Sequence, residues 1–301
     1  MNLFNIIKIK NTKYLFLLAF LVCNTSLHAH PFLLEVTGDH SFYLFGTIHL
    51  PDPRVTSLPV EVEEALKNST SFYAELDLSE ANTMEITQAM WLSEKQMLHA
   101  LLPEELKFKI NDYLKGINPE LNLELFSKQK IWVLAVTLTV LEQQLKFPGQ
   151  PPLDRALYEK ALNLGLHTGG LESVQDQLGI FEKMTQQEQI VFLSDTLEHL
   201  LKNKKNNSDF IEKSIHAYLA GDLDSLMSHL MSYMKDNKFY DDLMYQLVDI
   251  RNIRMTEKML TLVAENPSQK YFFAVGAGHF WKENSINQLL LNKGYSIQVI
   301  N

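Results

Sequence analysis

The sequence of 301 residues contains a single cysteine, Cys23. This residue lies within an amino-terminal segment that we expect to be removed on export, and the remaining chain then has no thiol. That absence excludes a disulfide framework, a zinc–thiolate site and a cysteine nucleophile. The composition also lacks the signature of disorder, because 46% of the residues are hydrophobic and 21% are charged.

Basic residues are scarce in this chain. It has 27 Lys and Arg against 36 Asp and Glu, which gives a formal net charge of −9. The one basic cluster, Lys202-Asn203-Lys204-Lys205, lies in an asparagine-rich stretch that we expect to be a solvated loop. Because binding to nucleic-acid phosphates requires clustered Lys and Arg, nucleic acid is not an expected partner.

The apolar runs are short. Tyr14 to Cys23 has ten residues and Ile131 to Leu141 has eleven, whereas a membrane-spanning helix needs about 20. Lys130 and Glu142 bracket the second run. We therefore predict that the second run forms a buried core helix.

The first run has the surroundings of a secretory signal peptide. Lys8, Lys10 and Lys13 precede it, and a short polar stretch after it ends at Ala29. We predict a signal peptide at about residues 1–29 and an exported, periplasmic chain, with a net charge of −12 once these three lysines are removed. The alternative is an uncleaved anchor, which would be the chain's one association with a membrane.

Strand-like and helical segments alternate near both chain ends, whereas the middle is mostly helical. We therefore predict an α/β fold with a central mixed sheet contributed by both chain ends. The large helical middle, about residues 80–240, is expected to be an insertion or cap within a single domain spanning residues 30–301. Strands are expected at residues 42–45, 71–76, 166–171, 271–275 and 295–300, and the main helices at residues 58–68, 79–102, 131–141, 153–163, 241–265 and 283–292.

Two segments, FYLFGTIHL at 42–50 and YFFAVGAGHF at 271–280, share a pattern. Each is an aromatic, apolar strand that stops at a glycine, Gly46 or Gly276, and is followed three residues later by His49 or His279. Glycine permits a tight turn at a sheet edge, and the carboxyl ends of strands are where open α/β sheets bind ligands. The two histidines could share a divalent metal; the alternative is that each is a packed or surface histidine.

A carboxylate and an arginine extend this candidate site. Glu75 lies inside an apolar strand, and a buried carboxylate is costly unless it is paired or metal-bound. Two histidines and one carboxylate would leave coordination positions open for water. The alternative for Glu75 is the outer, polar side of the strand, together with Tyr73 and Asp77. Arg251, one turn before Arg254 in the same predicted helix, could stabilise an oxyanion or hold a carboxylate, or else lie on the helix surface.

Six motifs in this order resemble the TraB/GumN family. They cover nearly all of the chain after the signal segment. The motifs are LFGTIHL at 44–50, YAELDL at 73–78, PLDRAL at 152–157, GGLESVQDQLGIF at 169–181, RN at 251–252 and VGAGHF at 275–280.

The resemblance implies an α/β fold related to the erythromycin-esterase and ChaN-like group. It also implies the divalent-metal-dependent protease activity described for the animal Tiki members, with manganese or cobalt, and zinc as a further option. By position, the metal ligands would be His49, His279 and Glu75, with Glu75 as ligand or general base. Arg251 would stabilise the oxyanion and Asn252 would position the substrate or Arg251. Glu172 and Gln177 match a further family stretch, and the alternative is that they only order the turn at Ser173.

Three functions follow from these observations. The first is a metal-dependent hydrolase of the cell envelope that acts on a peptide. The second is a protein that binds a peptide or small ligand without turnover, as the large helical middle and the pheromone-shutdown members of the family suggest. Haem or iron handling, implied by the distant ChaN-like resemblance, is the third and the weakest.

Overall fold

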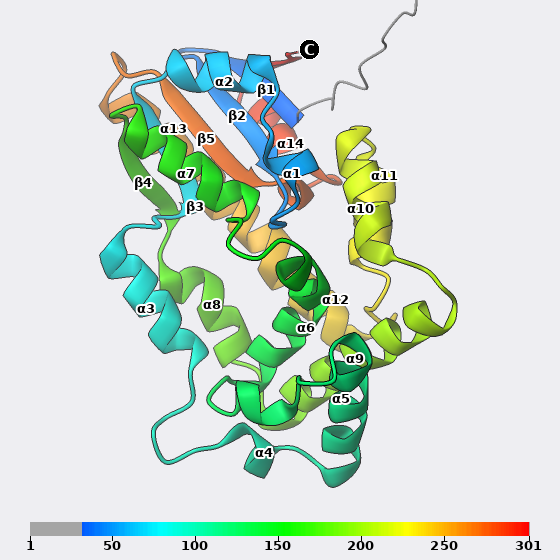
Figure 1. Ribbon diagram of the computed structural model, residues 1–301. Helices are drawn as coiled ribbons and strands as arrows, with labels where there is room; N and C mark the ends of the chain where they lie inside the picture. The colour runs from blue at the N-terminus through cyan, green and yellow to red at the C-terminus, as the bar shows by residue number, and fades with distance from the viewer. Residues whose placement is uncertain (1–31, 301) are drawn as a thin grey trace, which may run out of the picture.

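Both ends of the chain contribute strands to one six-stranded sheet in the computed structural model, which describes residues 32–300 (Figure 1). The predicted signal peptide at 1–29 lies outside the described residues. The strand order across the sheet is β4-β3-β5-β2-β1-β6. The strands are β1 (Phe32–Thr37), β2 (Phe42–Thr47), β3 (Ser71–Leu76), β4 (His167–Glu172), β5 (Tyr271–Gly276) and β6 (Ser296–Val299).

The sheet is mixed, and its parallel part contains the segments with the shared pattern. Strands β4, β3, β5 and β2 are parallel neighbours, while β1 runs antiparallel to both β2 and β6. In the β2–β5 pair, Gly46 lies opposite Val275 and Thr47 opposite Gly276. The predicted α/β fold with a mixed sheet from both chain ends is thereby confirmed. Strand β1 was not predicted.

Helices cover both faces of the sheet. On one face, α2 (Val60–Lys67), α7 (Leu153–Asn163) and α10 (Phe210–Leu219) pack against a core that includes Phe45, Phe72 and Phe272. On the other face, α13 (Arg251–Glu265) and α14 (Ile286–Asn292) pack against Leu44, Tyr271 and Phe273. In Figure 1, α2 and α7 lie in front of the sheet and α14 lies behind it. The central strands therefore bury residues on both sides.

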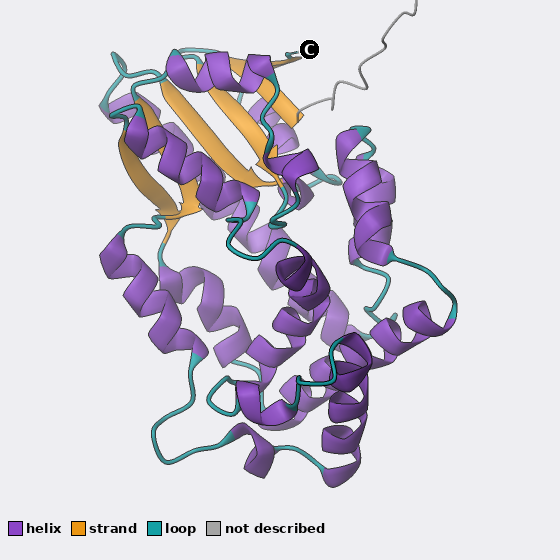
Figure 2. Cartoon of the chain, in the orientation of Figure 1, coloured by secondary structure: helices purple, strands orange, loops and turns teal. Residues whose placement is uncertain are grey.

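A separate lobe of helices lies beyond one end of the sheet (Figure 2). Its core includes Trp132, Leu134 and Leu138 of α6, which is the buried helix predicted at 131–141. No helix among residues 32–300 is long and apolar enough to cross a membrane.

The helices of this lobe are α3 (Glu80–Met90), α4 (Leu98–Leu101), α5 (Glu104–Ile117), η1 (Leu123–Phe126), α6 (Ile131–Lys146), α8 (Val174–Glu182), α9 (Gln186–Lys205) and α12 (Lys238–Met244). Four short helices remain: α1 (Pro53–Thr56), α11 (Leu223–Leu230), η2 (Tyr245–Ile250) and η3 (Ala277–Phe280).

Two details of the helical middle differ from the prediction. The helix expected at 79–102 ends at Met90, because Leu92 donates to the carbonyl of Lys128 and Lys130 donates to that of Met90. The cluster at 202–205, expected in a loop, forms the last turn of α9. In addition, α7 and β4 return to the sheet within the 80–240 span.

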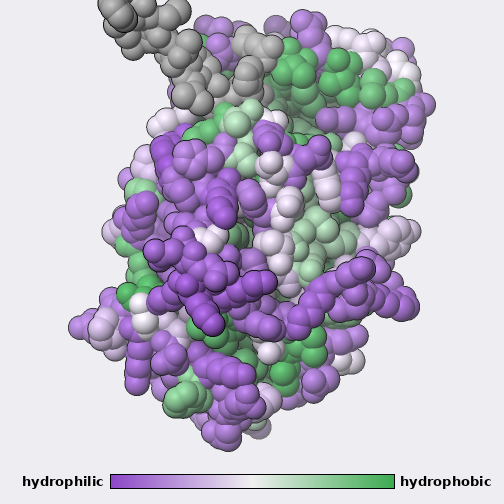
Figure 3. Space-filling model, turned by 90° about the vertical axis from the view of Figure 1, so that its right-hand side faces the viewer, coloured by the Kyte–Doolittle hydropathy of each residue, from purple (hydrophilic) through white to green (hydrophobic). Residues whose placement is uncertain are grey.

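The surface on the α10–α11 side of the molecule is predominantly hydrophilic (Figure 3). Hydrophobic areas on this face are small and are separated by hydrophilic ones. Scattered apolar groups of this kind are normal for a folded protein.

Candidate functional site

The predicted site residues meet at the carboxyl ends of the four parallel strands. His49 follows β2, and Glu75 is the last residue but one of β3. Glu172 ends β4, and His279 follows β5 within η3. Because parallel strands end at the same edge of a sheet, residues that are up to 230 positions apart become neighbours. The structure thus places next to one another the side chains that the sequence predicted as parts of one site.

Glu75 is buried at the centre of this group. Its Oε1 accepts a hydrogen bond from the main-chain N–H of Gly276 at 2.6 Å and lies 3.4 Å from Nε2 of His279. Its Oε2 accepts from Arg251 at 2.5 Å and from the amide of Gln177 at 2.7 Å. The outward position considered for Glu75 is therefore wrong, since β3 is covered on both faces and all six of its residues are buried.

Arg251 joins two carboxylates and is itself buried. Its guanidinium donates to Glu172 through Nε at 2.8 Å and through NH2 at 2.7 Å, and NH2 also donates to Glu75. NH1 donates to the carbonyl of Leu247. Neither Glu172 nor Gln177 serves only to order the turn at Ser173, because that turn is closed by a capping box between Ser173 and Asp176.

The helix predicted at 241–265 contains an irregularity directly before Arg251. Its residues form α12, a π-helical turn η2 (Tyr245–Ile250) and α13, which begins at Arg251. A π-helical turn adds a residue to the helical repeat and is frequent at functional sites. Here it lies immediately before the arginine and the asparagine that contact the site.

His279 is held in a defined orientation by Asn252. The Asn252 amide donates through Nδ2 to the carbonyl of Asn284 at 2.8 Å, so its Oδ1 faces Nδ1 of His279 at 2.6 Å. An amide oxygen only accepts, so Nδ1 carries the proton and Nε2 of the neutral ring is the free nitrogen. Asn252 therefore positions His279, and neither of its side-chain hydrogen bonds is to Arg251.

His49 also has a polar neighbour, which sequence reasoning missed. Its Nδ1 lies 3.0 Å from Oδ1 of Asp154, in the first turn of α7. Asp154 belongs to the PLDRAL motif, but an acidic residue in the first turn of a helix is usual because it complements the helix dipole. Nothing local in the sequence marks it as a partner of His49.

Charge and burial set the protonation of the site. Asp154 raises the pKa of His49 to about 9, although water screens this pair because 59% of the His49 side chain is exposed. Burial opposes the charge on Glu75, but Arg251 and His279 outweigh it and hold the pKa of that carboxyl well below its usual range. Burial raises the pKa of Glu172, and Arg251 only partly offsets this effect. Glu75 is therefore a carboxylate at neutral pH.

The donor atoms at this site are of the chemical types that bind divalent metal ions. In neutral His279, Nε2 is an acceptor facing the carboxylate oxygen of Glu75 at 3.4 Å, an arrangement that calls for a proton or a cation between them. A methyl group on Gly276 would lie 3.2 Å from Glu75 Oε1 and 3.8 Å from Nε2 of His49, so His49 faces the same point. Within residues 32–300 no three His, Cys, Asp or Glu side chains are placed so that they could hold a metal ion together, so metal binding would require these side chains to move closer to one another.

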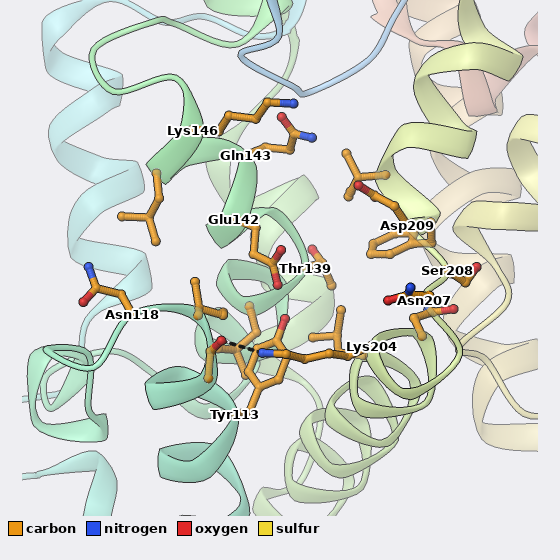
Figure 4. A pocket seen from close by; sticks show the side chains of 18 residues that line it. Tyr113, Asn118, Thr139, Glu142, Gln143, Lys146, Lys204, Asn207, Ser208 and Asp209 are labelled. Atoms are coloured by element: carbon orange, nitrogen blue, oxygen red, sulfur yellow. Dashed lines mark hydrogen bonds between the residues drawn. The ribbon is translucent and has the colours of Figure 1, made fainter.

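The cavity at this site is small, and larger ones lie elsewhere. A space of about 60 Å³ is lined by Thr47, His49, Glu75, Leu78, Asp154 and Gln177, among others. A cavity of about 680 Å³ lies in the helical lobe between α5, α6, α9 and α10 (Figure 4). There Lys204 donates to the carbonyl of Gly116 at 2.6 Å and lies near the ring of Tyr113. None of the predicted site residues lines that second cavity.

Comparison with known proteins gives relatives over most of the chain. A protein of Danio rerio named metalloprotease TIKI1 is 27% identical over 312 residues, covering 89% of this chain and 62% of that protein. The human metalloprotease TIKI1 is also 27% identical, covering 89% and 61%. The uncharacterized protein YbaP of Escherichia coli strain K12 is 25% identical over 260 residues, covering 85% of this chain and 90% of YbaP.

This chain spans about three fifths of the length of those TIKI relatives. No solved structure matches it. The sequence pattern of the TraB/PrgY/gumN family matches residues 32–299, which is nearly the whole of the described chain. The chain belongs to the TraB/PrgY/gumN family.

Proposed function

We propose that this protein is a divalent-metal-dependent hydrolase that cleaves peptide bonds. The observation that carries the proposal is the pair of histidines at the ends of β2 and β5. Each has its Nδ1 next to a polar side chain from another element, Asp154 or Asn252, and its Nε2 on the side of Glu75. Metal-binding histidines are held by such outer partners, which fix the ring and the tautomer. The names of the TIKI relatives support the protease assignment.

His49, His279 and Glu75 would hold the ion, which is manganese, cobalt or zinc. Bound there, a divalent ion supplies an acidified water molecule and polarises the carbonyl of the scissile bond. As a ligand, or as the general base in place of a ligand, Glu75 would act through Oε1, because Oε2 is occupied by Arg251 and Gln177. The main-chain N–H of Gly276 fixes that oxygen.

Arg251 positions Glu75 in this scheme. We assign it this role in place of the predicted stabilisation of an oxyanion, because its guanidinium already binds two carboxylates and a carbonyl. We also propose that the protein acts in the cell envelope after export, on the basis of the signal pattern at residues 1–29.

Loss of the two histidines is expected to remove metal binding and hydrolysis together. Chelator-treated wild-type protein should regain one equivalent of manganese, cobalt or zinc, and with it turnover of a peptide mixture supplied in excess. His49→Ala/His279→Ala should bind at least tenfold less metal, since two of the three ligands are gone. Metal content by mass spectrometry and product release are the two measurements.

The matched control is His216→Ala, an exposed histidine on α10, which should behave as wild type. If the double variant binds metal as well as the wild type, the ligand assignment is wrong. If the wild-type protein binds one equivalent of peptide and releases no product, it is a binding protein. A Soret absorption band after addition of haemin would favour haem handling.

The two glycines of the shared pattern are expected to respond differently to alanine. A methyl group on Gly46 would lie 2.8 Å from carbons of Phe32 and Phe280, so Gly46→Ala should cost about 1–3 kcal/mol in unfolding free energy. Gly276→Ala places its methyl group 3.2 Å from Oε1 of Glu75, where the metal and water bind in our proposal. Its rate should fall at least tenfold with a smaller loss of stability. Urea unfolding and turnover distinguish the two; equal effects on both would contradict the placement of the ion.

A further inference from the structure

The cavity at Glu75 is too small to recognise a substrate residue. Its volume of about 60 Å³ holds a few water molecules, each of which occupies about 30 Å³ in the liquid. Binding sites for small ligands have volumes of about 300–1,000 Å³. Any side chain that determines which peptide is cleaved must therefore bind in a neighbouring space.

Such a space lies between α3 and α7. This α3–α7 groove has a volume of about 720 Å³. It is lined by Met84 and Thr87 of α3, by Trp91 directly after α3, and by Arg155, Tyr158 and Leu162 of α7. Leu78, which links β3 to α3, lines both the groove and the small cavity at Glu75. The two spaces therefore lie on either side of this one residue.

The spacing of the lining residues shows that one face of each helix looks into the groove. Successive lining residues are three and then four positions apart on both helices, at 84, 87 and 91 and at 155, 158 and 162. Residues with this spacing lie on the same face of a helix. Asp154, which contacts His49, lies next to Arg155 in the first turn of α7. The same helix thus holds the site histidine and forms a wall of the groove.

The groove is apolar and its apolar side chains are not covered within the described chain. Met84, Trp91 and Leu162 are exposed to 58%, 56% and 50%. Helix α3 has no buried residue at all, which is unusual for a helix that lies against the rest of a protein. Single exposed apolar residues need no explanation, but a group of them in one concavity marks a binding surface.

The polar side chains of the α7 wall are already paired. Arg155 donates to Glu159 at 2.8 Å and to the carbonyl of Leu78 at 3.3 Å, and the hydroxyl of Tyr158 donates to Asp77 at 2.9 Å. The cation of Arg155 is therefore not left to attract an anionic ligand, and Glu80, which also lines the groove, would repel one. The α3–α7 groove is therefore suited to an apolar group of a ligand.

We propose that the α3–α7 groove binds a large apolar side chain of the peptide substrate, such as leucine, methionine or phenylalanine. A peptide anchored there enters the small cavity past Leu78, which places an adjacent peptide bond between His49 and Glu75. This inference rests on the proposed peptidase function, which it extends by naming the preferred class of substrate.

The test compares peptides that differ at one residue. The probes are Ac-Gly-Ser-Xaa-Ser-Gly-NH2 with Xaa as Leu, Phe, Ala or Asp, cleaved by the metal-loaded full chain. Leu162→Asp and Met84→Asp should each raise KM for the leucine peptide at least tenfold with kcat nearly unchanged, because burial of a leucine side chain contributes more than a factor of ten in binding. The matched control is Leu125→Asp, an exposed leucine in η1 outside the groove, which should leave KM unchanged.

Binding is measured separately from turnover through the fluorescence of Trp91. In Glu75→Gln protein the leucine and phenylalanine peptides should shift this emission, the aspartate peptide should not, and Trp91→Phe should abolish the shift. A shift without hydrolysis by the wild type would support the groove and overturn the peptidase function. Hydrolysis with unchanged KM in both groove variants, or an aspartate peptide preferred over leucine, would overturn the groove and leave the peptidase function standing. No binding and no hydrolysis would overturn both.

Discussion

Replacement of Glu75 with glutamine is expected to abolish peptide hydrolysis while leaving the fold intact. Glutamine retains an oxygen that can accept from the N–H of Gly276, so the end of β5 stays in place. It has no negative charge, so it neither takes a proton from water nor balances the charge of a metal ion. Loss of a positioned general base lowers rates by about 10²–10⁴-fold. The measurements are kcat at saturating metal and the far-ultraviolet circular dichroism of the variant.

The control for this substitution is Glu85→Gln on α3, where the carboxylate is exposed and outside the α3–α7 groove. Its kcat should match that of the wild type. Folding of Glu75→Gln should be retained because Arg251 still binds Glu172 through two nitrogens. A variant that keeps more than half of the wild-type kcat would show that hydrolysis takes place elsewhere on the molecule.

The convergence of the site was predictable because strand ends are predictable. Strand β3 and helix α7 occur at the residues expected, 71–76 and 153–163, since each is bounded by clear proline, glycine or asparagine signals. Once β2, β3 and β5 are neighbours in a parallel sheet, their carboxyl ends must meet. His49, Glu75 and His279 follow from that rule without any knowledge of side-chain contacts.

The alternation rule favoured the wrong alternative for Glu75. Two-residue alternation puts Glu75 on the same side as Tyr73 and Asp77, and in a half-exposed strand that side would face water. Strand β3 is central and is covered by helices on both faces, so both sides are buried. Strand β1 was not predicted for the same reason. Leu33 and Leu34 are adjacent in sequence but are buried in the cores on opposite faces of the sheet, so the strand shows no alternation of apolar and polar residues.

The partners of the site residues could not be read from the sequence. Asp154 is 105 positions from His49, and Glu172 is 79 positions from Arg251. Each of these carboxylates has an ordinary local explanation, as an acidic residue at a helix start or a strand end. Only the packing of α7 and α13 against opposite faces of the sheet brings them to their partners. Tertiary contacts of this kind leave no periodic signal.

Replacement of Arg251 with methionine is expected to cause the largest loss of stability. Methionine fills a similar volume and is compatible with a helix, but it leaves Glu75 and Glu172 buried and without a cation. Breaking a buried ion pair from one side costs about 3–5 kcal/mol, which for a chain of this size lowers Tm by on the order of 10 °C. Arg254→Met is the control, because Arg254 is exposed and lies 3.6 Å from Asp176. Its effect should be within about 0.5 kcal/mol.

The pH dependence separates this mechanism from a simple loss of packing. In the wild type, Arg251 and His279 outweigh burial and lower the pKa of Glu75, so the stability it contributes is present above an unfolded pKa of about 4.3 and is lost as pH falls. Without the arginine, burial is opposed less strongly and the pKa of both carboxyls rises relative to the wild type. The variant's native state then gains protons at higher pH than the wild-type native state, so its stability deficit should shrink between pH 8 and pH 5. Adding Glu172→Gln to Arg251→Met should recover part of the loss at pH 8, because one unpaired charge is removed. Urea unfolding at the two pH values measures both effects; an equal deficit at pH 8 and pH 5 would contradict the assignment of Arg251 as the counter-ion that holds Glu75 ionised.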